Sequence, residues 1–389
     1  MAVKWWVMVI TVIALLKVSA LPSFSQEQQQ ISDQVYRELD YLASLFNPEK
    51  ELDPTKLAAL IEFVESTPAD TSLDLKERNS MAGAFHSFQI DSSFEHLLSY
   101  VYNPDIPSYI TMPSSLQSHH SLTPEFAKEL RRLIDEASSP HSAVVLRGEE
   151  NQTITPDTNT GSYYSYSQGR LVALLPGVSG PVMLSATLQD QISDVGRRGC
   201  IVGDDGNWDY LFSDKTGLNT MGLGWVHSYM YEAYSVMLYI ADPASETIKT
   251  ATFKWLNAGW QKLNMVKSHH ILGGIKRFAG GLKSVLESPA LPEVTEIVDK
   301  YQELREKTEE ELRRLVTPYL ELIGNGKDAG SCPSSFISSV ASGEYLQQMS
   351  SDEIIRILLL EYIKTRIGDR TPETAAAHLL ADDRSGQRS

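Results

Sequence analysis

The sequence predicts an α+β fold, because a helical segment, a strand-rich segment and a second helical segment follow one another along the chain. Residues 26–137 repeat apolar side chains every three or four positions, which is the spacing of amphipathic helices. Residues 142–252 contain short β-branched and aromatic runs separated by turn residues, which is typical of an antiparallel sheet. From Phe253 onward the apolar period is helical again.

Helix starts in the first segment are indicated by capping residues. Asp53-Pro54 and Thr123-Pro124 each combine a capping side chain with proline at the first helical position. Ser92-Ser93 is expected to cap another helix. The first helix carries an apolar stripe made of Ile31, Val35, Leu39, Leu42, Leu45 and Phe46.

Turn residues divide the middle segment into strands. Gln168-Gly169 is expected to join a hairpin between residues 163–166 and 171–175. Asp204-Asp205-Gly206 is expected to separate two further strands, since it lacks the closing Glu of a calcium-binding EF-hand loop. Residues 225–240 are long enough for one strand, and their apolar side chains change sides part-way, which predicts a bulge.

Two long helices are expected in the last third of the chain. The first has an apolar face over residues 253–285, a length of about nine turns. The second covers residues 297–323 and ends at the glycines of residues 324–326. Ser350 and Glu353 form a capping-box pattern, which predicts a further helix after them.

The N-terminus has the pattern of a secretory signal peptide. Lys4 precedes an apolar run at residues 5–16, and the small residues Val18-Ser19-Ala20 follow. Lys17 and Pro22 keep this run shorter than the roughly 20 residues of a spanning helix, so cleavage is expected rather than anchoring. The mature protein is therefore expected to be secreted or periplasmic. The segments are 1–25 (signal peptide), 26–137 (helical), 138–288 (sheet and long helix), 289–380 (helical) and 381–389 (tail).

The charge of the chain limits its partners. Its net charge is −16, and it becomes −18 when Lys4 and Lys17 leave with the signal peptide. This acidity argues against nucleic acid and against anionic membrane surfaces as main partners. No second apolar run is long enough to span a membrane, so no transmembrane anchor is expected after cleavage.

The chain has two cysteines, Cys200 and Cys332. An oxidising compartment favours a disulfide between them. Such a bond would close a loop of about 130 residues, which the chain-entropy estimate values at roughly 5 kcal/mol. Two buried free thiols are the alternative, and the sequence alone supplies no geometry that decides between them.

The last strands and the helix after them carry a resemblance to a known superfamily. The runs are Gly259-Trp260-Gln261-Lys262-Leu263-Asn264-Met265-Val266 and Gly274-Ile275-Lys276-Arg277-Phe278-Ala279-Gly280-Gly281-Leu282-Lys283. Together with the preceding strands, over about residues 124–288, they resemble the closing part of START-like, helix-grip lipid-binding domains. The resemblance implies a curved sheet around a long helix and an apolar cavity. The implied pocket wall is Trp208, Tyr210, Trp225, Tyr229, Tyr231, Met265 and Phe278.

Two further residues of the long helix are candidate ligand contacts. Gly274 and Gly281 are seven residues apart and share a face, so they form a trough that admits a ligand or lets a sheet pack closely. His270 falls on the apolar face, where it either lines a pocket or is a hydrogen-bonded core histidine. The aromatic side chains of the implied wall have the same alternative, a simple packed core.

Catalytic and metal signals are weak in this sequence. Adjacent helical residues point about 100° apart, so His269-His270 is not expected to bind one metal ion. His119-His120 also lacks metal-ligand spacing, and no cofactor is expected. Cys200 is a candidate nucleophile if His227 or His270 lies near it.

These observations favour an exported, non-enzymatic protein that binds an apolar or lipid-like molecule between the sheet and the long helix. One alternative is a structural or interaction module that docks through its C-terminal helices, mainly residues 293–323. Another is a hydrolase that uses Cys200 or His270. The oligomeric state and the identity of the ligand do not follow from the sequence.

Overall fold

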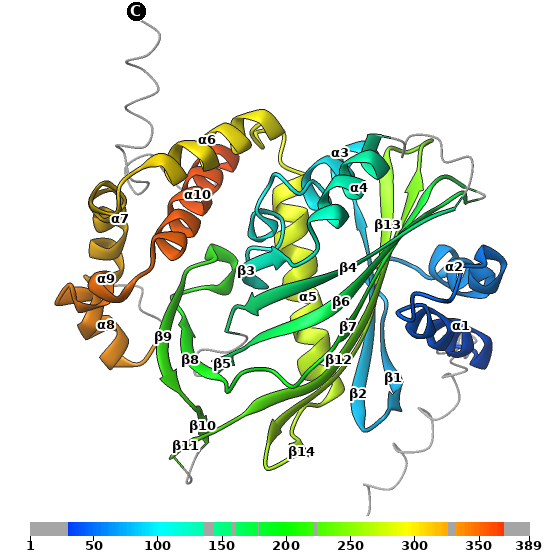
Figure 1. Cartoon of the computed structure of the whole chain (residues 1–389), viewed down its shortest axis with the longest axis horizontal. Helices are drawn as coiled ribbons and strands as arrows, with labels where there is room; N and C mark the ends of the chain where they lie inside the picture. Colours follow the sequence, from blue (N-terminus) through cyan, green and yellow to red (C-terminus); the bar gives the residue numbers. More distant parts are fainter. Residues whose placement is uncertain are drawn as a thin grey trace, which may run out of the picture.

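The computed structural model describes residues 30–135, 143–156, 161–177, 179–220, 224–325 and 332–368. The expected signal peptide and tail lie outside these residues. Within them the fold is α+β, as the sequence predicts: a large antiparallel sheet with helices that precede and follow most of its strands along the chain (Figure 1).

The main sheet has nine strands in the described part of the chain. Eight of them follow the order β1-β2-β13-β12-β7-β6-β4-β3, and β14 pairs with β13. Neighbouring strands are antiparallel throughout this order. The strands are β1 (Ser72–Arg78), β2 (Met81–Ile90), β3 (Leu116–Ser121), β4 (Val144–Ile154), β6 (Ser165–Leu175), β7 (Val182–Gln189), β12 (Tyr229–Asp242), β13 (Thr247–Trp260) and β14 (Leu263–Asn264).

Two small sheets lie beside the main one. The first pairs β5 (Ser162–Tyr163), β8 (Arg197–Ile201) and β9 (Tyr210–Thr216), and the second pairs β10 (Leu218–Thr220) with β11 (Gly224–Val226). The predicted turn between β8 and β9 is confirmed. There the side chain of Asp204 accepts a hydrogen bond from the Gly206 amide at 2.8 Å, before the short helix η3 (Asp205–Asn207).

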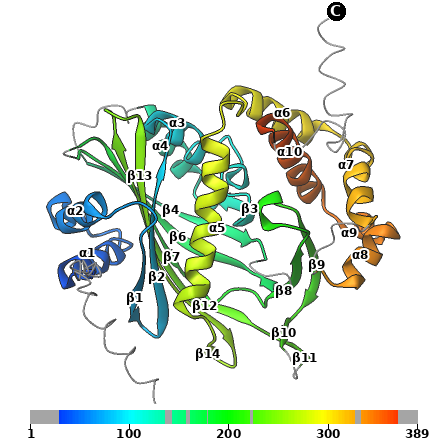
Figure 2. The ribbon, with the colours of Figure 1, turned by 180° about the vertical axis from the view of Figure 1, so that it is seen from behind.

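Helices cover both faces of the main sheet, as Figure 2 shows from behind. One face packs on α1 (Asp33–Ser44), η1 (Pro54–Leu57) and α2 (Ala58–Ser66), and the other packs on α3 (Phe94–Val101), α4 (Pro124–Asp135) and α5 (Ser268–Leu286). Strand β12 contributes side chains to the cores on both faces of the sheet, because successive side chains of a strand point to opposite faces. Val236 and Leu238 face α1 and α2, whereas Tyr239 joins the core beneath α5. The predicted caps Asp53 and Ser93 are confirmed.

The C-terminal helices form a group that is tied to the small sheets. They are α6 (Val294–Glu306), α7 (Glu309–Gly324), α8 (Ser334–Ala341), α9 (Glu344–Gln348) and α10 (Ser351–Ile367). Cys200 of β8 and Cys332 before α8 form a disulfide, with Cα atoms 5.5 Å apart. Lys364 of α10 is buried, and its Nζ lies 2.7 Å from a carboxylate oxygen of Asp209 and 2.8 Å from one of Glu361.

The apolar stripe of the predicted interaction helix is used within the chain. Residues 297–323 form α6 and α7 rather than one helix, because Thr308 starts α7 with a capping box. Leu304, Leu312 and Val316 are buried in the same core as α10. The stripe is therefore not an open docking face. The predicted capping box of Ser350 and Glu353 is confirmed at the start of α10.

The predicted helix over residues 253–285 is wrong in its first part. Residues up to Trp260 belong to β13, and α5 begins only at Ser268. Strand β13 lies between β2 and β12, and Ala251, Phe253 and Trp255 are all buried. These three side chains alternate with Thr252 and Lys254, as in a strand. Phe253, Leu256 and Trp260 are also three and four residues apart, so the same run fitted a helical period.

Three other expectations need correction. Residues 26–137 are not purely helical, because β1, β2 and β3 lie within them and join the main sheet. The hairpin at Gln168-Gly169 does not exist, since β6 continues through it. A side chain at Gly169 would meet the Phe46 ring at 3.0 Å, so this glycine serves close packing rather than a turn. Residues 225–240 are split between β11 and β12, with the predicted irregularity between Met230 and Glu232.

Candidate functional site

A pocket of about 830 Å³ lies where the β3 side of the main sheet meets the C-terminal helices. One wall is formed by β3, β4 and β6, and another by residues 101–109, which include the start of the short helix η2 (Ser108–Ile110). Side chains of α4, α6 and the N-terminal turn of α10 complete the lining. This volume is within the range of small-molecule sites in proteins.

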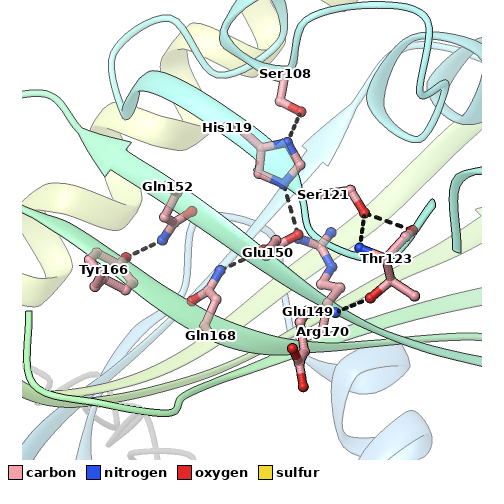
Figure 3. A network of polar contacts seen from close by, with 10 residues as sticks. All are labelled: Ser108, His119, Ser121, Thr123, Glu149, Glu150, Gln152, Tyr166, Gln168 and Arg170. Atoms are coloured by element: carbon pink, nitrogen blue, oxygen red, sulfur yellow. Dashed lines mark hydrogen bonds and ion pairs between the residues drawn. The ribbon is translucent and has the colours of Figure 1, made fainter.

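The register of three strands brings a polar network to this pocket (Figure 3). Glu150 of β4 is directly opposite Gln168 of β6, and Arg170 is two residues farther along β6 on the same face. His119 of β3 is opposite Gln152, which is two residues from Glu150 on the same face of β4. Alternation along each strand therefore points these side chains toward one another.

Glu150 is the centre of the network. Its carboxylate is buried and accepts a hydrogen bond from Gln168 Nε2 at 2.6 Å, while Arg170 lies 3.3 Å from the same oxygen. His119 Nε2 lies 2.8 Å from the other oxygen, Oε2. Burial by itself would raise the pKa of Glu150, but the charge of Arg170 and the hydrogen bonds from His119 and Gln168 lower it to about 2. Glu150 is therefore a carboxylate throughout the physiological pH range.

The ionised Glu150 determines which nitrogen of His119 carries a proton. A carboxylate only accepts hydrogen bonds, so the nitrogen 2.8 Å from Glu150, Nε2, must donate. In the neutral ring the other nitrogen, Nδ1, is then an acceptor. It lies 3.1 Å from the hydroxyl oxygen of Ser108, the first residue of η2. Ser108, His119 and Glu150 thus form a continuous hydrogen-bonded chain at the pocket wall.

Arg170 also contacts an aromatic ring, that of Tyr102. Its guanidinium lies 6.0 Å from the centre of the Tyr102 ring, a cation–π distance. Burial lowers the pKa of Arg170, but Glu150, Tyr102 and Tyr239 together outweigh burial and raise it. Gln152, beside this pair, donates to the hydroxyl of Tyr166. The charges in the pocket wall are therefore fixed in position by their neighbours.

The rest of the lining is mixed in character. Tyr109, Tyr163 and Tyr301 supply aromatic surface, and Phe126, Leu130 and Val172 supply apolar surface. Carboxylates outnumber guanidinium groups among the described lining residues. The charged lining residues are Asp105, Glu150, Asp214, Asp352 and Glu353 against Arg170, Arg197 and Arg305.

The aromatic residues predicted as a pocket wall do not gather around this pocket. Trp208 and Tyr210 are buried in a separate small core with Val285. Tyr229 and Tyr231 neighbour each other on β12, with ring centres 6.3 Å apart. Two others sit elsewhere: Met265 is exposed, and Phe278 packs edge-on against Phe88 beneath α5. The side chain of Trp225 lies outside what the structure describes.

Gly274 and Gly281 of α5 do not form the predicted trough facing the sheet. A side chain at Gly274 would meet no atom within 4 Å, whereas one at Gly281 would lie 3.0 Å from Ser114 Oγ. The face of α5 toward the sheet is filled by its own buried side chains, namely Ile271, Ile275, Phe278 and Leu282. His270 is exposed, and its Nδ1 accepts a hydrogen bond from the Lys267 amide at 3.1 Å, which caps the helix.

The disulfide overturns the cysteine hydrolase hypothesis. The sulfur atom of Cys200 is bonded to Cys332 and is not a thiol, so it has no nucleophilic role. The His270 side chain instead accepts a backbone hydrogen bond that caps the start of α5. In the described residues no cluster of His, Cys, Asp or Glu suits a metal ion, and no helix combines the length and apolar character needed to cross a membrane.

The residues predicted from the sequence did not include Ser108, Glu150, Gln168 or Arg170, and His119 was considered only as a metal ligand. The available signal was period-two polar residues on two neighbouring strands, Glu150 and Gln152 in β4 and Gln168 and Arg170 in β6. No protein-family model and no curated protein matches the sequence.

Proposed function

We propose that this protein binds a small organic molecule in the pocket beside β3, β4 and β6. The observation that carries the proposal is the buried, charged network of Glu150, Arg170 and His119 at the wall of a pocket of ligand size. Buried ion pairs add little net stability compared with apolar packing, so their cost is more readily explained by a site than by the fold.

The lining favours an uncharged or cationic ligand with an apolar or aromatic part. Excess carboxylates disfavour an anion, and the tyrosine rings suit a flat or apolar group. The sequence favoured an apolar ligand between the sheet and the long helix. The filled face of α5 moves the proposed site to this pocket, and the polar network widens the ligand class beyond lipids.

The place of action is part of the same proposal. The signal-peptide pattern of residues 1–25 supports an exported protein, secreted or periplasmic. The disulfide supports an oxidising compartment, because such bonds persist there and are rare in the cytosol. The resemblance to START-like domains remains a prediction.

Native mass spectrometry of the purified protein would test binding. A co-purifying molecule is expected in the wild type and is expected to be absent from Gln302→Trp, which places an indole in the pocket from the exposed side of α6. Asp299→Trp is the matched control, since Asp299 is exposed on the same helix and does not line the pocket. If both variants retain the molecule equally, it binds elsewhere and the proposal fails.

A further inference from the structure

The pocket holds a hydroxyl group in the arrangement of an activated nucleophile. Ser108 Oγ, His119 Nδ1 and Nε2, and Glu150 Oε2 follow one another with separations of 3.1 and 2.8 Å. All three residues line the pocket, and Ser108 is only half-buried. We propose that Ser108 is the nucleophile of a carboxylic ester hydrolase in this pocket, with His119 as its general base. This inference rests on the proposed function, because it assigns chemistry to the same binding site.

The arrangement meets the requirements for serine activation. A serine hydroxyl is a weak nucleophile unless a base within hydrogen-bond reach removes its proton. Because Glu150 fixes the proton on Nε2, Nδ1 is left as the acceptor facing Ser108. Glu150 also stabilises the imidazolium that forms when Nδ1 takes the proton. Glu150 is therefore a positioning residue, and Ser108 and His119 are the catalytic residues.

The supporting groups hold this chain in place. Arg170 and Gln168 occupy the Glu150 oxygen that does not contact His119, so each carboxylate oxygen has a defined partner. Ser108 follows Pro107, whose φ is −58°, and opens η2, so its backbone is constrained. Such pre-organisation is a requirement for efficient catalysis by fixed side chains.

The proposed reaction has two steps. Ser108 Oγ attacks the ester carbonyl carbon while His119 Nδ1 takes the hydroxyl proton. The C–O bond to the alcohol then breaks, and the leaving alkoxide takes that proton from His119. A water molecule next attacks the acyl-serine ester and gives its proton to His119, which returns it to Ser108 Oγ as the carboxylic acid leaves. The lining favours esters without a negative charge in either part.

Covalent labelling of the full chain with a fluorophosphonate probe would test the nucleophile. The probe phosphonylates an activated serine and releases fluoride, and peptide mapping is expected to place the adduct on Ser108. Ser108→Ala should abolish labelling, and His119→Asn should slow it at least about 100-fold. Ser115→Ala is the control, because Ser115 lies in the same segment but does not line the pocket. It should label at the wild-type rate.

Steady-state hydrolysis of p-nitrophenyl butyrate separates catalysis from structure. Glu150→Gln is expected to lower kcat at least about 100-fold with little change in KM, and Glu150→Asp should restore part of it. A merely structural role would change KM together with kcat. The melting temperature does not separate the two roles, because Glu150→Gln also leaves Arg170 without its buried partner. If the folded wild type is not labelled but retains its ligand in native mass spectrometry, the hydrolase inference fails and the binding proposal stands. Labelling of Ser108→Ala at the wild-type rate would also overturn the inference.

Discussion

The lowered pKa of Glu150 predicts how the folding stability of the protein changes with pH. A pKa lowered from the ordinary value of 4.5 to about 2 corresponds to about 3 kcal/mol of folding stability above pH 4.5. Because the folded-state pKa is the lower one, this stability is lost as the pH falls from 4.5 toward 2. Between pH 6 and pH 3.5 the loss amounts to about 1.4 kcal/mol.

Glu150→Gln removes this titration. At pH 6 the variant should be less stable than the wild type by roughly 3 kcal/mol, because Arg170 loses its buried partner. At pH 3.5 the difference should be smaller by about 1.4 kcal/mol. Urea denaturation followed by tryptophan fluorescence at both pH values measures it. Glu149→Gln is the matched control, since Figure 3 shows the Glu149 carboxylate directed away from the network. Parallel pH profiles for the wild type and Glu150→Gln would refute the reasoning.

Three further predictions concern stability alone. Lys364→Met leaves the buried carboxylates of Asp209 and Glu361 without their shared cation, so urea denaturation should show the free energy of unfolding lowered by about 3–5 kcal/mol. A near-neutral result would contradict the ion-pair assignment. Gly83→Ala should lower the free energy of unfolding by about 1–3 kcal/mol, because its methyl group would lie 2.6 Å from the Trp255 indole. Gly280 is exposed in α5 and has open space around it, so Gly280→Ala should raise the free energy of unfolding by up to about 1 kcal/mol in the same assay. Reducing the disulfide should lower the melting temperature, because a crosslink across 132 residues contributes about 5 kcal/mol, and an unchanged transition in dithiothreitol would count against it.

Local chemistry made several helix boundaries predictable from the sequence. Asp53 and Ser93 cap helices in the structure because capping needs only an oxygen acceptor next to free backbone amides. The boundary near Phe253 was not predictable, because Phe253, Leu256 and Trp260 fit a helical spacing while Ala251, Phe253 and Trp255 fit the alternation of a strand. Gly169 was misread because a turn and a close packing contact both require the same missing side chain.

The candidate site depends on information that no local pattern contains. His119 and Glu150 are 31 residues apart in sequence, and they meet only because β3 pairs with β4 in one register. A slip of one residue would turn each side chain to the opposite face. Arg170 depends in the same way on the pairing of β4 with β6. The sequence shows these residues as polar positions in strands, and the register makes them a network.

The pocket is lined by segments from distant parts of the chain, and this has a consequence for biosynthesis. Residues 101–172, which carry the charged network, leave the ribosome long before α6 and α10, which complete the lining. A nascent chain therefore presents the polar half of the site without its covering helices. A product that stops before Val294 would keep Ser108, His119 and Glu150 but lose part of the enclosure that separates them from bulk water.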